Sequence, residues 1–291
     1  MAISSYRIKA PAKVNIRLKV TGCRPDGYHE LVSIMVPVNL FDILELKSPF
    51  NGHIKITHEG FDVPSDESNL IWRAAESFMS RTGIDSGVSI KLIKNIPIAA
   101  GLGGGSSDAA ATLLALNKIY SRPLSESGLH NLAINLGADV PFFLDCRPSL
   151  VTGVGEILEP LDNWPEFWYV IITPPIRVST SWAYGNLKLE LTIGEYDYIV
   201  NFLKTDNFAI SHILENDLEK VTSTSFPIIN TLKKLLVDAG AAGAIMSGSG
   251  PSVFGLFLSP GKAKSARDSL ISLELGDVFM VKGGGTELIY R

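Results

Sequence analysis

The sequence predicts an α+β protein of two domains, with residues 1–155 in the first and residues 156–291 in the second. Its 291 residues, of which 46% are hydrophobic, are enough for one large or two medium domains with buried cores. Strand-like and helix-like patterns follow one another in mixed order, without the regular alternation of a doubly wound sheet. A strand, a glycine-rich turn and a helix also follow one another directly in residues 88–120.

The first half opens with strands. Apolar and polar residues alternate over residues 14–20, which predicts a half-buried strand, and further strand-like runs occupy residues 31–40, 41–46 and 53–57. An apolar stripe at helical spacing predicts a helix over residues 68–81, closed by Gly83. After a strand at residues 88–92, helices are expected over residues 109–120 and 125–136, the second ending at Gly137.

The second half is read in the same way. An apolar run predicts a strand over residues 169–173, and shorter strands are expected at 244–246, 252–258 and 278–281. Helices are expected over residues 195–204, 227–239 and 262–271. The middle one has Pro227 at its start and Gly240 just beyond its end, which is the usual asymmetry of helix ends.

The glycine-rich turn between residues 97 and 107 predicts a phosphate site. Four of the five residues from 101 to 105 are glycine, which leaves backbone N–H groups free of side-chain cover. Ser106 or Ser107 is expected to cap the following helix, whose positive end then points at the same place. The turn is not a Walker loop, because no Lys follows it, nor a dinucleotide fingerprint, because Ser106 stands where the third glycine belongs. The alternative is a plain connector.

Composition narrows the functional class. The net charge of −4 and the lack of a basic run argue against nucleic acid as the main partner. Cys23 and Cys146 are too few for a disulfide framework or a zinc cluster, so a reducing cytoplasm is expected. Residues 1–13 do not read as a signal peptide, and no apolar run approaches the ~20 residues of a membrane span.

Two more segments stand out, namely Ala-Pro-Ala-Lys-Val-Asn at residues 10–15 and Gly-Ser-Gly-Pro at 248–251. Alone, Lys13 would be read as a solvated side chain and the second segment as a hairpin turn. Together with the glycine-rich turn, and in this order, they resemble the GHMP kinases, which phosphorylate small molecules such as galactose, homoserine and mevalonate. The resemblance implies the two-domain fold of that family, with the active site in the cleft between the domains.

Within that family the resemblance is narrower and runs nearly end to end. Residues 10–15, 24–30, 100–110, 136–142 and 153–156 are similar to the branch that uses ATP to phosphorylate the 2-hydroxyl of a cytidine-diphosphate derivative of methylerythritol, in non-mevalonate isoprenoid synthesis. The run Gly27-Tyr28-His29 speaks against the mevalonate or homoserine type of kinase. A non-catalytic ligand sensor on this fold should have lost the catalytic base or the glycine-rich turn. This chain retains both the turn and Asp139, the residue at the position of the base.

The resemblance also implies roles for single residues. Asp139, which by itself reads as a turn residue at a helix end, is implied as the general base, with Lys13 keeping it ionised. The diphosphate of ATP is expected on the N–H groups of residues 101–107, with Mg²⁺ arriving on ATP. The ATP-binding set is Asn69, Leu70, Lys94, Pro97, Ala99, Ala100, Gly101, Leu102, Gly103, Gly104, Gly105, Ser106 and Ser107.

The remaining implied residues bind the cytidyl substrate. Tyr28 is expected to stack on cytosine and His29 to hydrogen-bond its edge, although an aromatic residue could merely cover the core and a lone His is often structural. Tyr184 falls where the family has a second stacking aromatic residue. The substrate-binding set is Asn15, Tyr28, His29, Asp139, Thr180, Tyr184, Gly248 and Ser249. A monomer or a homodimer is expected, with no nucleic-acid or membrane partner.

Overall fold

Eleven strands of one mixed sheet form the centre of the molecule in the computed structural model, which describes residues 4–187, 194–203 and 212–283. The main path through the sheet is β3-β4-β2-β11-β7-β10-β9, while β1, β5, β6 and β8 attach beside it. The strands are β1 (Ser4–Cys23), β2 (His29–Phe50), β3 (Ile54–Gly60), β4 (Gly87–Lys94), β5 (Ser149–Thr152), β6 (Ile157–Pro160), β7 (Phe167–Thr173), β8 (Glu215–Asn216), β9 (Gly243–Met246), β10 (Val253–Phe257) and β11 (Asp277–Gly283).

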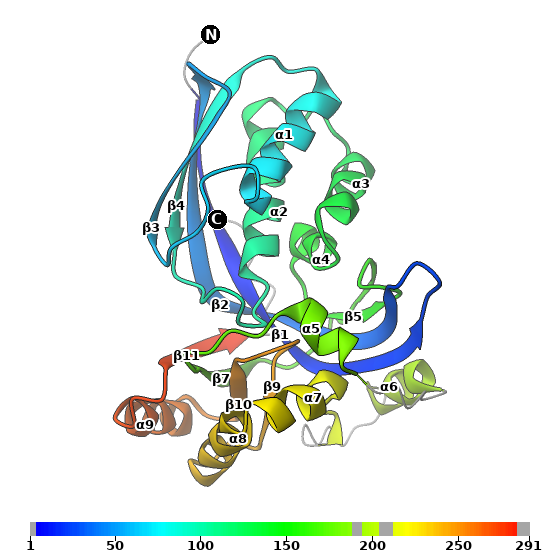
Figure 1. Ribbon diagram of the computed structural model, residues 1–291, viewed down its shortest axis with the longest axis vertical. Helices are drawn as coiled ribbons and strands as arrows, with labels where there is room; N and C mark the ends of the chain where they lie inside the picture. Colours follow the sequence, from blue (N-terminus) through cyan, green and yellow to red (C-terminus); the bar gives the residue numbers. More distant parts are fainter. Residues whose placement is uncertain (1–3, 188–193, 204–211, 284–291) are drawn as a thin grey trace.

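The long hairpin of β1 and β2 runs through both halves of the molecule (Figure 1). The sequence predicted a break between residues 40 and 41, but β2 continues for 22 residues. A bulge explains the difference, because Pro11 pairs with Phe41 while Ala12 pairs with Val38. The extra residues of β2 therefore bend the strand without ending it.

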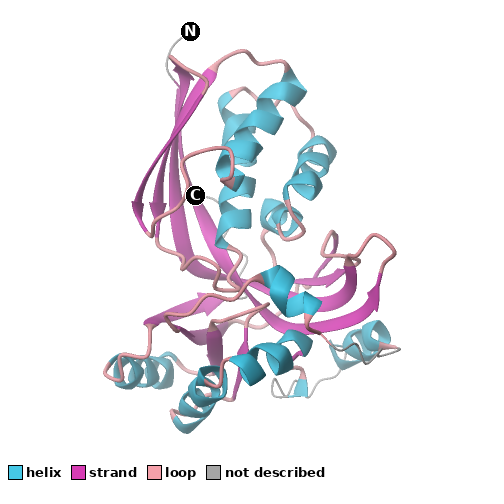
Figure 2. Ribbon diagram, in the orientation of Figure 1, coloured by secondary structure: helices cyan, strands magenta, loops and turns pink. Residues whose placement is uncertain are grey.

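Helices cover one face of the upper sheet, as Figure 2 shows. The predicted helix over residues 68–81 is confirmed as α1 (Leu70–Thr82), capped by the Asn69 side chain and closed by Gly83 in the left-handed region. The helix over residues 125–136 is confirmed as α3 (Glu126–Leu136), capped by Ser125. The short α4 (Val140–Asp145) follows it and was not predicted.

The helix after the glycine-rich turn starts earlier than predicted. It is α2 (Gly104–Ile119), and Gly103 stands at its N-cap with φ of 71° and no side-chain cap hydrogen bond. The prediction that Ser106 or Ser107 caps the helix is therefore wrong, because both residues lie inside the first turn. The weak helix propensity of glycine hid this start, since packing of the surrounding protein outweighs propensity here.

The predicted helices of the second half are confirmed as α6 (Glu195–Leu203), α8 (Ile228–Asp238) and α9 (Pro260–Ile271), although residue 204 lies outside the described residues. The expected strands 169–173, 244–246, 252–258 and 278–281 correspond to β7, β9, β10 and β11. Short elements escaped prediction, namely α5 (Thr180–Gly185), α7 (Asp217–Ser225), β5, β6 and β8. Runs this short contain too few periods to be recognised.

The apolar core continues across the middle of the molecule. One cluster joins Val14 and Val36 of the long hairpin to Tyr169 of β7 and Phe254 of β10. Leu102 of the glycine-rich turn is buried in the same cluster, so the turn rests on the core shared by both halves. A domain boundary near residue 155, which lies in the turn between β5 and β6, stays a prediction. Among the described residues, no helix is both long and apolar enough to cross a membrane.

Candidate active site

A cavity of about 760 Å³ lies where β1, the start of α2, α5 and the loop after β9 meet. Residues from both halves of the chain line it, and they include every predicted site residue except Ser107. Its lining also contains residues that the sequence did not single out, among them Leu18, Met35, Val63, Pro64, Ile98, Asp108, Ala138, Val154, Ser181 and Leu218.

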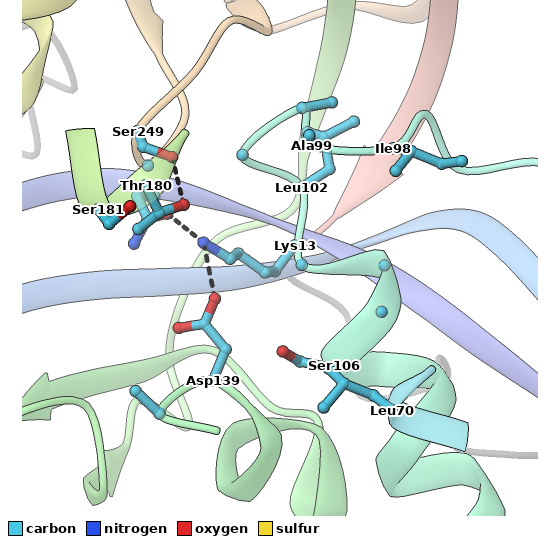
Figure 3. A pocket seen from close by; sticks show the side chains of 18 of the residues that line it. Lys13, Leu70, Ile98, Ala99, Leu102, Ser106, Asp139, Thr180, Ser181 and Ser249 are labelled. Atoms are coloured by element: carbon cyan, nitrogen blue, oxygen red, sulfur yellow. Dashed lines mark hydrogen bonds and ion pairs between the residues drawn. The ribbon is translucent and has the colours of Figure 1, made fainter. Parts of the chain in front are cut away.

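Lys13 and Asp139 face each other in this cavity (Figure 3). The Lys13 Nζ atom lies 3.4 Å from Asp139 Oδ2 and donates a hydrogen bond of 2.5 Å to Asn15 Oδ1. The backbone N–H of Lys13 donates to the carbonyl of Leu102 at 2.9 Å. The Lys13 side chain is 5% exposed and that of Asp139 is 31% exposed, so the carboxylate is the member of the pair that a ligand can reach.

Asn15 connects this pair to both glycine-rich loops. Its Nδ2 atom donates to Ser33 Oγ at 2.9 Å, which leaves Oδ1 turned toward Lys13. Its backbone N–H donates to Ser247 Oγ at 3.3 Å, and that hydroxyl donates in turn to the carbonyl of Gly101 at 2.8 Å. The ammonium of Lys13 is therefore held by a buried network and does not move freely on a long side chain.

Asp139 begins a helix instead of ending one. It occupies the N-cap position of α4, directly after the segment that closes α3, and its side chain makes no capping hydrogen bond. The residues that follow, Phe142 and Phe143, are buried and fix the short helix against α2. The carboxylate is left to face Lys13, which keeps a nearby positive charge beside it.

Two glycines of the turn are required by the protein's own packing. A Cβ atom on Gly101 would lie 2.0 Å from the carbonyl oxygen of Ser247, and one on Gly103 would lie 2.8 Å from the ring of Phe143 and 3.0 Å from Lys13 Cγ. Gly105 is different, because its nearest neighbour would be Leu70 Cδ1 at 3.7 Å. Gly105 therefore leaves open space at the wall of the cavity.

The N–H groups of the first turn of α2 are the phosphate candidates. A helix leaves its first N–H groups without partners inside the helix, and Gly104, Gly105 and Ser106 occupy these positions at the cavity wall. The expectation for Ser107 needs correction. Its N–H donates to the carbonyl of Gly103 at 2.9 Å and its side chain is fully buried, so it is already part of the helix interior.

One end of the cavity is formed by the start of α1 and the end of β4. The Asn69 side chain accepts from the N–H of Ile71 at 2.9 Å and donates to the carbonyl of Pro64 at 2.7 Å, so it holds the loop before α1. Lys94 is 4% exposed, and its ammonium contacts the carboxylates of Asp42 and Asp108. Burial alone would lower the pKa of Lys94, but the two carboxylates outweigh it and raise that pKa.

The other end of the cavity is aromatic. The rings of His29 and Tyr184 lie with centroids 5.0 Å apart and planes tilted by 32°, and the Tyr28 side chain beside them is largely exposed. Burial and the charge of Asp139 raise the pKa of Tyr184. Thr180 Oγ1 and Ser249 Oγ are hydrogen-bonded at 3.0 Å nearby (Figure 3). The helix α5, which carries Thr180 and Tyr184, could not be read from the sequence, yet both residues line the cavity.

The carboxylates of the site do not form a metal cage. No group of three or more His, Cys, Asp or Glu side chains suited to holding a metal occurs in residues 4–187, 194–203 and 212–283. The exposed part of Asp139 is compatible with a Mg²⁺ ion that keeps several waters and is held mainly by phosphate oxygens, which is the usual manner of Mg²⁺ binding.

Comparison with protein families places this chain among known kinases. Residues 69–146 match the GHMP kinases N terminal domain, and residues 199–273 match the GHMP kinases C terminal domain. The chain belongs to the GHMP kinase family.

The similar sequences are more specific. The chain is 45% identical over 270 residues to the 4-diphosphocytidyl-2-C-methyl-D-erythritol kinase of Geobacter metallireducens, covering 92% of this chain and 95% of that protein. It is also 45% identical to the kinase of the same name from Syntrophus aciditrophicus, with coverages of 95% and 98%. A crystal structure of a 4-(cytidine 5'-diphospho)-2C-methyl-D-erythritol kinase matches with a TM-score of 0.80 and 36% identity, covering 96% of this chain and all of that one.

More distant structures share only the fold. The homoserine kinase of Cytophaga hutchinsonii matches with a TM-score of 0.75 at 23% identity, covering 95% of this chain and 94% of that chain. The mevalonate kinase of L. major matches with a TM-score of 0.70 at 12% identity, covering 96% of each chain.

Proposed function

We propose that this chain transfers the γ-phosphoryl group of ATP to the 2-hydroxyl of 4-diphosphocytidyl-2-C-methyl-D-erythritol, giving ADP and the 2-phosphate. The reaction belongs to the non-mevalonate route to isopentenyl diphosphate. One observation carries the assignment at the level of the site. The Lys13–Asp139 pair lies in the same cavity as the free helix start of α2 and the His29–Tyr184 ring pair. The relatives of that name, 45% identical over most of the chain, support the same substrate.

Asp139 acts as the general base in this proposal. A substrate hydroxyl placed beside its exposed oxygen loses its proton to the carboxylate while the hydroxyl oxygen attacks the γ-phosphorus. The Lys13 ammonium lies 3.4 Å from Asp139. Its positive charge offsets the negative charge that develops on the transferred group.

The phosphates of ATP lie against the first turn of α2. Its free N–H groups and the positive end of the helix dipole attract the phosphate oxygens. A Mg²⁺ ion bound to ATP would neutralise phosphate charge at this place. The base of ATP lies toward Asn69 and Leu70, at the end of the cavity that Val63 and Pro64 also line.

The cytidyl substrate occupies the aromatic end. Tyr28 stacks on cytosine and His29 hydrogen-bonds its edge. Tyr184, whose ring packs against that of His29, is the second stacking aromatic residue. Asn15, Thr180, Gly248 and Ser249 line the stretch between the base and Lys13, where the diphosphate and the sugar alcohol fit. We further propose that the protein works in the cytoplasm, since its cysteines Cys23 and Cys146 are both free.

The experiment that tests this function is a coupled assay of ADP release. The purified protein is offered the cytidyl substrate, mevalonate and homoserine in parallel, each with Mg²⁺ and ATP. We expect turnover with the cytidyl substrate alone. Preference for mevalonate or homoserine would keep the kinase assignment but overturn the substrate. ADP release that is independent of every acceptor would overturn both.

A further inference from the structure

A buried cluster of three ionisable side chains lies behind the start of α2. It consists of Asp42 on β2, Lys94 at the end of β4 and Asp108 within α2, and all three are at most 4% exposed. The Lys94 ammonium donates hydrogen bonds to Asp42 Oδ2 and, at 2.7 Å, to Asp108 Oδ2. The three side chains come from segments far apart in the sequence, so the cluster exists only in the folded chain.

Asp42 also holds the beginning of the glycine-rich segment. Its Oδ1 atom accepts the backbone N–H of Asn95 at 2.7 Å and that of Ile96 at 2.8 Å. The Asn95 side chain adds a hydrogen bond of 2.8 Å to the carbonyl of Phe41, next to Asp42. One carboxylate therefore fixes the point where the chain leaves β4 and enters the turn.

Asp108 holds the other end of the same segment. It stands in the helix that follows the turn, four residues after Gly104, and it binds the ammonium that Asp42 also binds. The entry and the exit of the turn are therefore joined through one Lys side chain. Such a closed arrangement removes freedom from the backbone between the two ends.

The cluster lies directly behind the proposed phosphate seat. A Cβ atom on Gly104 would lie 3.0 Å from Lys94 Nζ, so the ammonium touches the first residue of α2. In the same turn, Ser107 Oγ and Asp108 Oδ1 are buried without a hydrogen-bond partner among the residues described. Buried polar atoms are seldom left in this way, which points to a role beyond stability.

We propose that Asp42, acting through Lys94 and Asp108, is a positioning residue of the ATP site. It sets the spacing between the two ends of the glycine-rich turn, so that the free N–H groups of α2 are in place before ATP arrives. The inference rests on the proposed function for its substrate, but its direct readout is nucleotide binding. Preorganised donors bind a phosphate more tightly than donors that must first be ordered.

The test compares two variants with a matched control. Asp42→Asn can still accept the N–H groups of Asn95 and Ile96 through its amide oxygen, but its NH₂ group then meets the Lys94 ammonium as a second donor. Asp108→Asn removes the carboxylate charge that binds Lys94 from the helix side, although its amide oxygen can still accept, and it leaves the Asp42–Lys94 pair intact. The control, Glu195→Gln, weakens an equally buried ion pair with Arg17 whose two partners are absent from the cavity lining.

Calorimetry then measures the affinity of each variant for ADP and for the cytidyl substrate, with a melting curve beside it. We expect Asp42→Asn to weaken ADP binding about tenfold and Asp108→Asn several-fold, while cytidyl affinity changes less than twofold and the control binds both ligands normally. ATP KM should rise in the same order, with a smaller change in kcat.

Two results would overturn the proposal. One is unchanged ADP affinity in folded Asp108→Asn protein, which decides the matter even if Asp42→Asn does not fold. The other is equal weakening of both ligands, which would make the cluster merely structural. If the unmodified protein binds ADP but does not phosphorylate the cytidyl substrate, the proposed function fails while the ADP measurements still test Asp42.

Discussion

Asp139 shows at the scale of a single residue how much the surroundings decide. In the sequence it is one Asp among apolar neighbours at a helix end. In the structure its side chain makes no capping hydrogen bond and faces the ammonium of Lys13, which donates to Asn15, while the backbone N–H of Lys13 donates to the Leu102 carbonyl. A partly exposed carboxylate in this position is within reach of a bound hydroxyl.

Replacing Asp139 by Asn keeps the shape of the side chain and removes its ability to take a proton. We expect kcat to fall by ~10²–10⁴ while the affinity for both substrates stays nearly unchanged. Steady-state kinetics combined with calorimetry would measure the two effects separately. Turnover within a few-fold of the unmodified enzyme would show that Asp139 only helps to place Lys13.

His29 and Tyr28 should affect the choice of base in different ways. Stacking contributes ~1–3 kcal/mol per base and depends little on which base is stacked, whereas an edge hydrogen bond distinguishes cytosine from uracil. We therefore expect Tyr28→Ala to weaken the cytidyl and uridyl substrates alike. His29→Ala should weaken the cytidyl substrate more and reduce the preference, measured as the ratio of kcat/KM values. If neither variant changes these ratios or affinities, the base lies elsewhere.

Asp42 marks the limit of what a single residue reveals in a sequence. The motif residues Lys13, Asn15, Tyr28 and His29 were found because they stand in runs that resemble a family. An isolated Asp in a strand has no such run. The available signal was physical, since a charged residue in the strand-like run of residues 41–46 must find a partner when it is buried. This signal indicates that Asp42 needs a partner, but it does not indicate which residue the partner is.

At the scale of an element, α2 explains why the glycines of one loop are not equivalent. Gly101 and Gly103 have positive φ values and face close neighbours, so the fold requires them. Gly105 lies in the first helical turn with open space before it. The sequence predicted the loop and its phosphate role together. It could not show which glycines the fold requires and which leave space for a ligand, because this depends on contacts with Ser247 and Phe143.

This difference predicts that one substitution affects ATP binding and another affects the stability of the fold. Gly105→Val should leave the melting temperature within a few degrees and weaken ATP binding at least tenfold, because the new methyl groups stand at the cavity wall. Gly103→Val should lower the melting temperature strongly, since it meets Phe143 and Lys13 in a left-handed backbone. Melting curves measure the effect on stability, and nucleotide titrations measure the effect on ATP binding. Normal ATP binding by Gly105→Val would show that the phosphates do not bind at the first turn of α2.

The ion pairs between β1 and Glu215 of β8 predict a pH dependence of stability. Partial burial would raise the pKa of Glu215, but the hydrogen bond from Lys19 and the charge of Arg17 outweigh it and lower that pKa. The carboxylate therefore stabilises the fold above its unfolded pKa, and this contribution is lost as the pH falls through the lower folded value.

We expect Glu215→Gln to reduce the free energy of unfolding at pH 7 by about 1 kcal/mol or less, because the side chain is partly exposed. The difference between the two proteins should begin to shrink near the unfolded pKa of Glu, about 4.3, and disappear as the pH falls through the lower folded value. Urea unfolding at a series of pH values gives both numbers. A difference that persists undiminished at pH 3 would mean that packing, and not charge, carries the effect.

For the molecule as a whole, the fold class and most helices were predictable, and the joining of the halves was not. Periodic patterns identified α1, α3, α8 and the strands β7, β9, β10 and β11. The pairing of β11 with β2, and the core cluster that joins Val36 to Tyr169, involve residues more than a hundred positions apart. Local periodicity contains no information about such pairs. The cavity could not be predicted from the sequence for the same reason, because its lining residues come from both halves of the chain.

The unbroken hairpin of β1 and β2 has a consequence for how the protein opens. The alternate residues Lys13, Asn15, Arg17 and Lys19 share one strand and are all buried, so the end of β1 that lines the cavity and the anchors of α6 and α7 belong to one cooperative unit. We expect the backbone amides of residues 13–19 and 31–38 to be the slowest to exchange with deuterium, at one common rate set by global unfolding. Activity and these amides should then be lost together on heating. Faster exchange on one side of Lys13 would reveal a hinge through the active site.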